Sequence, residues 1–283
     1  MSDSPQITPR ILVTTDFSIE SERAFYHALA FAVKNRARLT LLHTGPETRE
    51  SVPWGRFPGV RETLAIWGLL PGDAPRAAVA ETLGLGVTKM AMRDDDPRLG
   101  ITDYLRRRPT DLLVMATEGR RGLARLLNPS VADTVTQLTR SHTLMLPKHA
   151  QGFIDPASGK SSLRRVLCAL DPHKDPRPAM AYLKTWLPVM AGDGGVEVVM
   201  LLTDEWADAA PPLMPQAEGQ HWRQETRGGD PLEALVSAAA DLEAGLVAIS
   251  ARGPVGLGAR LRGTRTDKIL LQLGLPLLSI PAL

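Results

Sequence analysis

The sequence predicts an α/β protein made of two tandem, doubly wound (Rossmann-like) domains. The chain has 283 residues, about twice the usual length of one domain. Residues 10–16 (RILVTTD) are matched by residues 165–171 (RVLCALD), which indicates an internal repeat. Short apolar runs alternate with helical patterns in both halves. This alternation is typical of a parallel sheet covered on both faces by helices.

A second pair of matching segments fixes the extent of the repeat. Residues 111–116 and the following Gly119 match residues 245–250 and the following Gly253. The second copy is shorter, because only residues 204–220 separate its second and third strands. We therefore expect the second domain to lack a full helix there.

These matches divide the chain into three parts. We expect a first domain over residues 1–148, a linker over 149–163 and a second domain over 164–283. The linker contains glycine, proline and serine, which are typical of connecting segments.

The first domain has five apolar runs that end at polar residues or turns, and we interpret them as strands. They cover residues 11–15, 38–43, 87–92, 111–116 and 143–146. Apolar residues at helical spacing follow Ser18, which is placed to cap a helix. Further helices are expected over residues 61–69, 75–83, 99–107 and 130–139.

The second domain repeats this order with fewer elements. A helix should start at Pro176, where a missing N–H group costs nothing. Apolar residues from Leu232 to Leu242 predict another helix before a strand over 246–250. The final strand, 277–280, and its counterpart 143–146 would be exposed edges unless they are covered.

Composition excludes several classes of protein. The chain has 33 Lys and Arg against 31 Asp and Glu, so its net charge of +2 gives no case for a nucleic-acid binder. A single cysteine, Cys168, excludes an intramolecular disulfide and a cysteine-based metal cluster. The histidines show no pair at metal-ligand spacing. No signal peptide or membrane span is visible, so we expect a soluble cytoplasmic protein.

Ligands of open parallel sheets bind at the carboxyl ends of the strands, near the point where strand order reverses. Asp16 and Asp171 follow the first strand of each domain, and a glycine-containing segment follows each fourth strand. In the second domain Gly253 is followed by Gly263 and Thr264 at a helix start. Free amides, a close approach of the backbone and a hydroxyl donor there favour a phosphate group.

The first domain has a weaker version of this segment. Its glycine is Gly119, and Pro129 and Ser130 stand where the second domain has Gly263 and Thr264. Proline has no N–H group, so one donor to a phosphate is missing. Asp16 and Asp171 also have a simpler interpretation, as caps of the turns that lead into helices.

Taken together, these residues resemble the universal stress protein family in its tandem two-domain form. The resemblance lies in residues 13–18 (VTTDFS), in 41–43 (LLH), and in the glycine segments from Val114 to Val131 and from Val247 to Arg265. It implies a five-stranded parallel sheet in each domain. In some members of the family, ATP, here expected with Mg²⁺, binds at the strand ends.

The resemblance also implies which residues would hold the nucleotide. In the second domain they are Asp171, Thr203, Ser250, Gly253, Gly263, Thr264 and Arg265. In the first domain they are Asp16, Thr44, Ala116, Gly119, Ser130 and Val131. The family's first glycine is Ala116 in one domain and Ser250 in the other, and its third is Pro129 in the first domain. These departures favour the second domain as the nucleotide site.

The interpretation that follows is a stress-response regulatory or binding protein, with neither a catalytic residue nor a metal site readable in its sequence. Two alternatives stay open: a slow ATP-hydrolysing enzyme, and a nucleotide-free scaffold that acts through protein interaction. In the family two domains pair through the last strand, so the repeats are expected to pair with each other as an internal pseudo-dimer. The protein partner, and whether two chains form a homodimer, cannot be read from the sequence.

Overall fold

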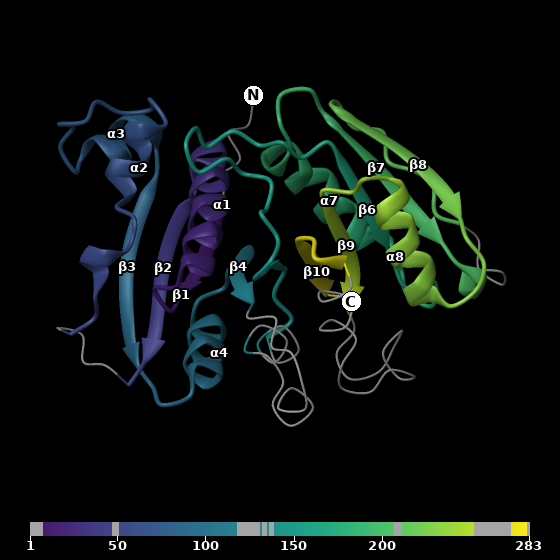
Figure 1. The fold of residues 1–283 in the computed structure, drawn as a ribbon, viewed down its shortest axis with the longest axis horizontal. Helices are drawn as coiled ribbons and strands as arrows, with labels where there is room; N and C mark the ends of the chain where they lie inside the picture. The colour runs from purple at the N-terminus through teal and green to yellow at the C-terminus, as the bar shows by residue number, and fades with distance from the viewer. Residues whose placement is uncertain are drawn as a thin grey trace, which may run out of the picture.

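The computed structural model describes residues 8–46, 51–117, 131, 135, 139–206, 211–251 and 273–281. Within these residues, ten strands form one continuous sheet in the order β3-β2-β1-β4-β5-β10-β9-β6-β7-β8 (Figure 1). All neighbouring strands are parallel except β5 and β10, which are antiparallel.

Each half of the sheet has the same strand order, and strands and helices alternate along the chain. The strands of the first half are β1 (Arg10–Thr15), β2 (Arg38–Gly45), β3 (Gly86–Arg93), β4 (Leu112–Thr117) and β5 (Thr143–Pro147). Those of the second half are β6 (Arg165–Ala169), β7 (Val196–Leu202), β8 (Gln220–Thr226), β9 (Leu246–Ala251) and β10 (Leu277–Pro281). The predicted doubly wound fold, with five strands in each half, is confirmed.

Helices cover both faces of the sheet. The first half has α1 (Ile19–Asn35), η1 (Trp54–Arg56), α2 (Val60–Ile66), α3 (Ala78–Leu83) and α4 (Pro97–Arg107), and the second has α7 (Arg177–Met190), η2 (Asp204–Trp206) and α8 (Pro231–Asp241). On one face, α1 and α7 contribute side chains such as Phe25 and Leu183 to a shared apolar core. On the other face, α4 and α8 pack Ile101 and Leu235 against the sheet.

Strands β5 and β10 join the two halves. Leu277 pairs with Met145, Leu278 with Leu144 and Ser279 with Thr143, and all six residues are buried. This confirms the expected internal pairing through the last strands. Side chains also bridge the halves: the Tyr182 hydroxyl donates to the carbonyl oxygen of Asp111 (3.2 Å), and Lys34 donates to that of Ala191 (2.7 Å).

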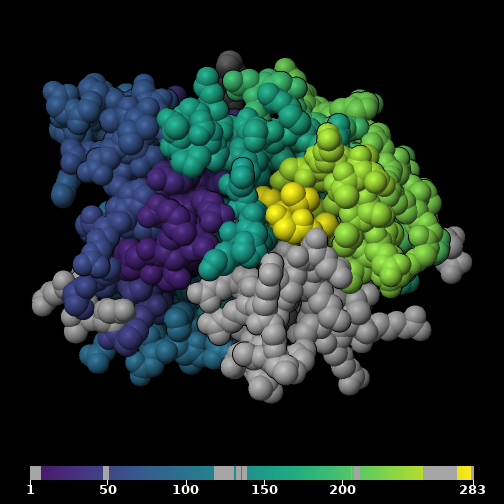
Figure 2. All heavy atoms as spheres, viewed as in Figure 1, coloured from purple at the N-terminus to yellow at the C-terminus, as the bar shows by residue number. Residues whose placement is uncertain are grey.

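Sheet twist brings the carboxyl ends of both halves to one side of the molecule. Neighbouring strands rotate by roughly 20–25°, so four steps from the centre to either edge turn the strand direction by about 80–100°. The rotations in the two halves add up to about half a turn, which compensates for the opposite directions of β5 and β10. Accordingly, the arrowheads of β2, β3 and β8 all point toward the lower side of Figure 1. Figure 2 shows the two halves closely packed on the face in view.

Most predicted elements lie where the sequence pattern placed them. The Ser18 hydroxyl caps α1 by accepting from the Ser21 amide (3.2 Å), and Asp96 caps α4 in the same way. Between β7 and β8, the described residues form only η2 and irregular chain, in agreement with the expected loss of a helix. The predicted helix over 130–139 lies mostly outside the described residues, although Val131, Val135 and Thr139 are helical.

One helix start differs from the prediction. Helix α7 begins at Arg177, and Pro176 is its capping residue, not its first helical residue. The carboxylate of Asp175 accepts from the amide of Arg177 (3.0 Å), so the side chain before the proline satisfies the first free donor of the helix. None of the described helices is long and apolar enough to cross a membrane.

The segment between the halves packs against α1 and is hydrogen-bonded to it. The buried ring of His27 accepts at Nε2 from the amides of Phe153 (3.0 Å) and Ile154 (3.3 Å), and its Nδ1 donates to the carbonyl oxygen of Arg23 (2.8 Å). Gly152 has φ +77°, and a Cβ there would lie 2.3 Å from Cε1 of His27. A glycine is therefore required where the linker crosses this ring.

We expect the free energy of unfolding to fall as the pH is lowered from 6.5 toward 4. Burial lowers the pKa of His27 to about 4, so the folded protein keeps this ring neutral while the unfolded chain takes up a proton near pH 6.5. A shift of this size corresponds to about 3 kcal/mol, present above pH 6.5 and lost by about pH 4. Urea unfolding at neutral pH and near pH 4.5 measures the loss.

The variant His27→Gln should remove this part of the pH dependence, whereas His149→Gln, at an exposed histidine, should keep it. Burial also lowers the pKa of His142 to about 4, so part of the dependence remains in His27→Gln. An unchanged pH dependence in His27→Gln contradicts the prediction.

Candidate functional site

The strand order reverses between β1 and β4 in the first half and between β6 and β9 in the second. The predicted site residues Asp16, Asp171, Ala116 and Ser250 follow or end these strands. Gly119, Ser130, Gly253, Gly263, Thr264 and Arg265 lie outside the described residues. The described part of the candidate site therefore consists of the strand ends.

Asp16 forms a tight turn between β1 and α1. Its Oδ1 accepts from the amide (3.0 Å) and the hydroxyl (2.5 Å) of Ser18, the residue that caps α1. Burial acts to raise the pKa of Asp16, but the hydrogen bonds from Ser18 outweigh it and hold the pKa below its usual value. The carboxylate is thus an anion that orders the turn, and it remains exposed to solvent.

Phe17, which the sequence did not single out, has a strained backbone at this turn. Its φ is 64°, a left-handed conformation that is rare for a bulky residue, and its amide donates to the hydroxyl of Thr15 (2.9 Å). Its ring lies 4.7 Å from the ring of His43 and 5.2 Å from that of Trp54. Such strain costs about 1–3 kcal/mol, which the surrounding aromatic contacts must offset.

Thr44, at the end of β2, is buried and points toward α4. A Cβ on Gly100 of that helix would lie 2.3 Å from Cγ2 of Thr44. The glycine lets α4 approach the strand, so the methyl group of the threonine fills the space. The methyl group of Thr44 is therefore part of the packing, and its buried hydroxyl has no hydrogen-bond partner among the described residues.

The second half differs at the equivalent of Asp16. The side chain of Asp171 is only 2% exposed, and its Oδ1 accepts from the amide of His173 (2.9 Å). Its own amide donates to the hydroxyl of Ser250 (2.7 Å), which joins the end of β6 to the end of β9. The hydroxyl that replaces the family's glycine is thus used within the protein. These two residues are 79 apart in the chain, so their pairing could not be read from local sequence.

Thr203, the counterpart of Thr44, is half-buried after β7. Its carbonyl oxygen accepts from the amide of Trp206 (2.9 Å), a buried residue in η2. The next residue, Asp204, accepts from the amide of Gly229 (2.9 Å) and so ties the ends of β7 and β8 together. The chain therefore leaves β7 as a short turn held by the protein itself.

The described residues contain no group of three or more His, Cys, Asp or Glu side chains placed to hold a metal ion. Cys168 is fully buried in β6, and burial raises the pKa of its thiol to about 12. It is an unreactive core residue.

The comparisons with known proteins agree with this architecture. A family model described as the universal stress protein family matches residues 8–147. This chain belongs to the universal stress protein family. Its second half repeats the topology of the matched half, with a shorter connection between β7 and β8.

Solved structures with the same fold extend over both halves of this universal stress protein. One is a universal stress protein from Archaeoglobus fulgidus DSM 4304, with 15% identity, coverage of 96% of each chain and a TM-score of 0.61. Another, described as a universal stress protein from Pseudomonas aeruginosa UCBPP-PA14, has 14% identity, covers 98% of this chain and 94% of its own, and has a TM-score of 0.58.

The arrangement also occurs outside the stress proteins. The cytoplasmic domain of a prokaryotic cation chloride cotransporter has 11% identity, covers 96% of this chain and 95% of its own, and has a TM-score of 0.50. No curated protein matches the chain. At these identities the likenesses show the fold alone, so function has to be argued from the site.

We expect Gly100→Ala to destabilise the protein by about 1–3 kcal/mol, because the new methyl group overlaps Cγ2 of Thr44. Helix propensity alone predicts the opposite sign, since alanine is favoured over glycine in a helix. Thr44→Ser removes Cγ2, so it should restore most of the loss when combined with Gly100→Ala. Urea unfolding of the four proteins in a double-mutant cycle measures this coupling. A stabilised Gly100→Ala variant would show that the contact is absent.

Proposed function

We propose that this protein is a regulatory member of its family that binds an adenine nucleotide, as ATP with Mg²⁺, at the carboxyl edge of its second half. The observation that carries the proposal is the hydrogen bond between the amide of Asp171 and the hydroxyl of Ser250. It joins the two strand ends that flank the reversal of strand order, where ligands of such sheets bind. In the sequence, Gly253 comes three residues after Ser250, and Gly263 and Thr264 come ten and eleven residues after Gly253.

In the proposed site, backbone amides would bind the phosphates, and the side chains of Asp171 and Ser250 would order the strand ends and contact the ribose. The glycine segment would supply backbone amides to the phosphates, a role in which the first half is weaker because of Pro129. Asp171 is buried and holds its turn through His173, so we assign it to positioning the strand end. The Ser250 hydroxyl accepts from Asp171 and can still donate its own hydrogen to a ribose oxygen.

A nucleotide-free scaffold is the second candidate, and a specific observation favours it. The side chain of Asp171 is 2% exposed, whereas Asp16 in the first half is exposed. A base that needs the carboxylate of Asp171 would have to displace the contacts that bury it. If calorimetry detects no binding of ATP, ADP or AMP at millimolar concentration, the scaffold replaces the nucleotide-binding proposal.

The variant Ser250→Gly restores the family's glycine and tests the proposed site directly. It removes the hydroxyl that would donate to the ribose, so we expect ATP to bind about three- to tenfold more weakly. The loss of the hydrogen bond to the Asp171 amide should cost about 1 kcal/mol of stability, which thermal melting with and without ATP separates from the affinity. Calorimetry measures the dissociation constant.

Ala116→Gly is the matched control, because Ala116 has the same place at the end of β4. It should leave the affinity for ATP within about twofold of the wild type. If Ala116→Gly changes the affinity and Ser250→Gly does not, the nucleotide site lies in the first half. Mass spectrometry of the supernatant from denatured, freshly purified protein would identify any adenine nucleotide that remains bound through purification.

A further inference from the structure

A second candidate site lies at the opposite, amino end of the strands in the first half. A pocket of about 350 Å³ opens there between the starts of β1, β2 and β3 and the end of α4. Its lining includes three arginines and four hydroxyl groups, from Arg10, Arg38, Arg108, Thr40, Thr88, Tyr104 and Thr110. No residue of the proposed nucleotide site lines it.

Three arginines line this pocket, and no carboxylate is among the residues that line it. Arg10 and Arg38 are direct neighbours in the parallel pairing of β1 and β2. Among the described residues, none of the three guanidinium groups forms an ion pair. Asp111 lies beside Arg10, but its Oδ2 accepts from the backbone amide of that residue (2.7 Å). The pocket therefore gathers more positive charge than its own residues neutralise.

The equivalent positions of the second half can be compared with this pocket. Arg165 starts β6 as Arg10 starts β1, and its neighbour on β7 is Glu197, where the first half has Arg38. Glu197 accepts from Nε of Arg165 (2.7 Å) and from Nε of Arg223 (2.7 Å). The hydrogen bonds from these arginines hold the pKa of Glu197 below its usual value.

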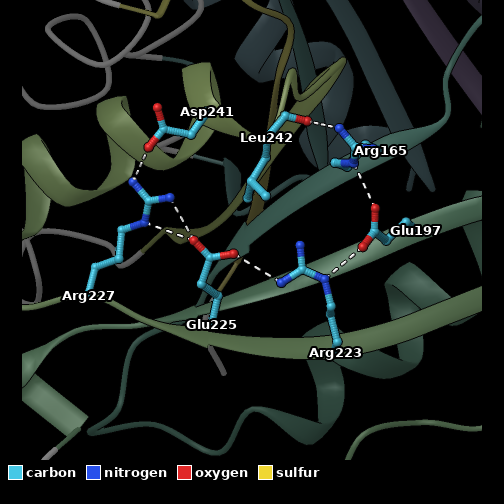
Figure 3. Close-up of polar contacts among 7 residues, drawn as sticks. All are labelled: Arg165, Glu197, Arg223, Glu225, Arg227, Asp241 and Leu242. Carbon is cyan, nitrogen blue, oxygen red and sulfur yellow. Dashed lines mark hydrogen bonds and ion pairs between the residues drawn. The ribbon is translucent and has the colours of Figure 1, made fainter.

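Figure 3 shows that these ion pairs continue across the second half. Arg223 donates to Glu225 (3.0 Å), which accepts from Arg227 (2.7 Å), and Arg227 donates to Asp241 on α8 (2.7 Å). Each cation in the row has an acid beside it. The amino ends of β6 and β7 are thus neutralised by Glu197 in the second half, whereas in the first half Arg38 stands where this carboxylate would be.

We propose that the amino-end pocket of the first half binds an anion of the phosphate class, either free phosphate or the phosphoryl group of a small ester. The anion would take the place that the carboxylate of Glu197 has in the second half. Guanidinium groups match phosphate oxygens through paired N–H donors, and several of them around one anion give both charge and orientation.

Two contacts prepare the pocket for such a ligand. The guanidinium of Arg108 lies over the ring of Tyr104, 5.9 Å from its centre, which limits the positions that this arginine adopts. The buried Tyr104 donates its hydroxyl hydrogen to Thr40 (3.3 Å). The hydroxyl of Thr40 then has its own hydrogen free to donate to an oxyanion.

Calorimetric titration with inorganic phosphate and with methyl phosphate tests the proposal on the whole chain. We expect binding at millimolar concentration or below, weakened by added salt. Tighter binding of inorganic phosphate would indicate a free anion as the ligand, and tighter binding of methyl phosphate would indicate an ester. If neither binds, the proposal is overturned.

Variants separate the pocket from general surface charge. Arg38→Gln and Arg108→Gln should each weaken binding at least about tenfold, because each removes a donor to the anion. Arg106→Gln is the matched control: it removes one positive charge from α4 at a residue that does not line the pocket, and should change binding by less than about twofold. Equal weakening in Arg106→Gln and Arg38→Gln overturns the proposal.

Arg38→Glu gives a further test, because it copies the Arg165–Glu197 pair into the first half. We expect this variant to lose phosphate binding while it melts at or above the temperature of the wild type. Retained phosphate binding in a folded Arg38→Glu protein contradicts the proposal. The outcome is independent of the nucleotide proposal, since adenosine, which has no phosphate, should not bind this pocket and Ser250→Gly should leave phosphate binding unchanged.

Discussion

The antiparallel pairing of β5 with β10 is the constraint on which the rest of the structure depends. Each of these strands would otherwise be an open edge with a row of unpaired backbone groups. Their pairing buries Met145 and Leu277 completely and turns two five-stranded sheets into one. It also brings α7 against the first half, where the Tyr182 ring stacks on His142 with 3.6 Å between ring centres. The folded linker over His27 then follows the surface of a single body.

Much of the fold could be predicted because the sequence contains an internal repeat. The repeated strand that ends at Asp16 and Asp171 gave the domain order, and local capping residues such as Ser18 gave helix starts. The site was less accessible to this reasoning. The burial of Asp171 depends on packing, and its hydrogen bond to Ser250 joins residues that are distant in the chain. The left-handed Phe17 was missed as well, because bulky residues have no sequence signal for that conformation.

The two halves keep one backbone arrangement and differ in the charge and exposure of a few side chains. At the carboxyl ends, an exposed Asp16 corresponds to a buried Asp171, and Ala116 corresponds to a Ser250 that is hydrogen-bonded within the protein. At the amino ends, Arg38 corresponds to Glu197. None of these exchanges alters the strand register. Differences of this kind are where separate functions of the halves should be sought.

The row of ion pairs in the second half shows how this scaffold neutralises clustered arginines, and the arginines of the pocket in the first half lack such partners among the described residues. The acids on β7 and β8, Glu197 and Glu225, are half-buried, and each accepts from two arginines. They offset the repulsion among Arg165 on β6, Arg223 on β8 and Arg227 directly after β8. The first half has this repulsion between Arg10 and Arg38 and no equivalent acid between them. An uncompensated cluster in a pocket, beside a compensated one on the same scaffold, is better explained by an anion from solution than by the folding of the sheet.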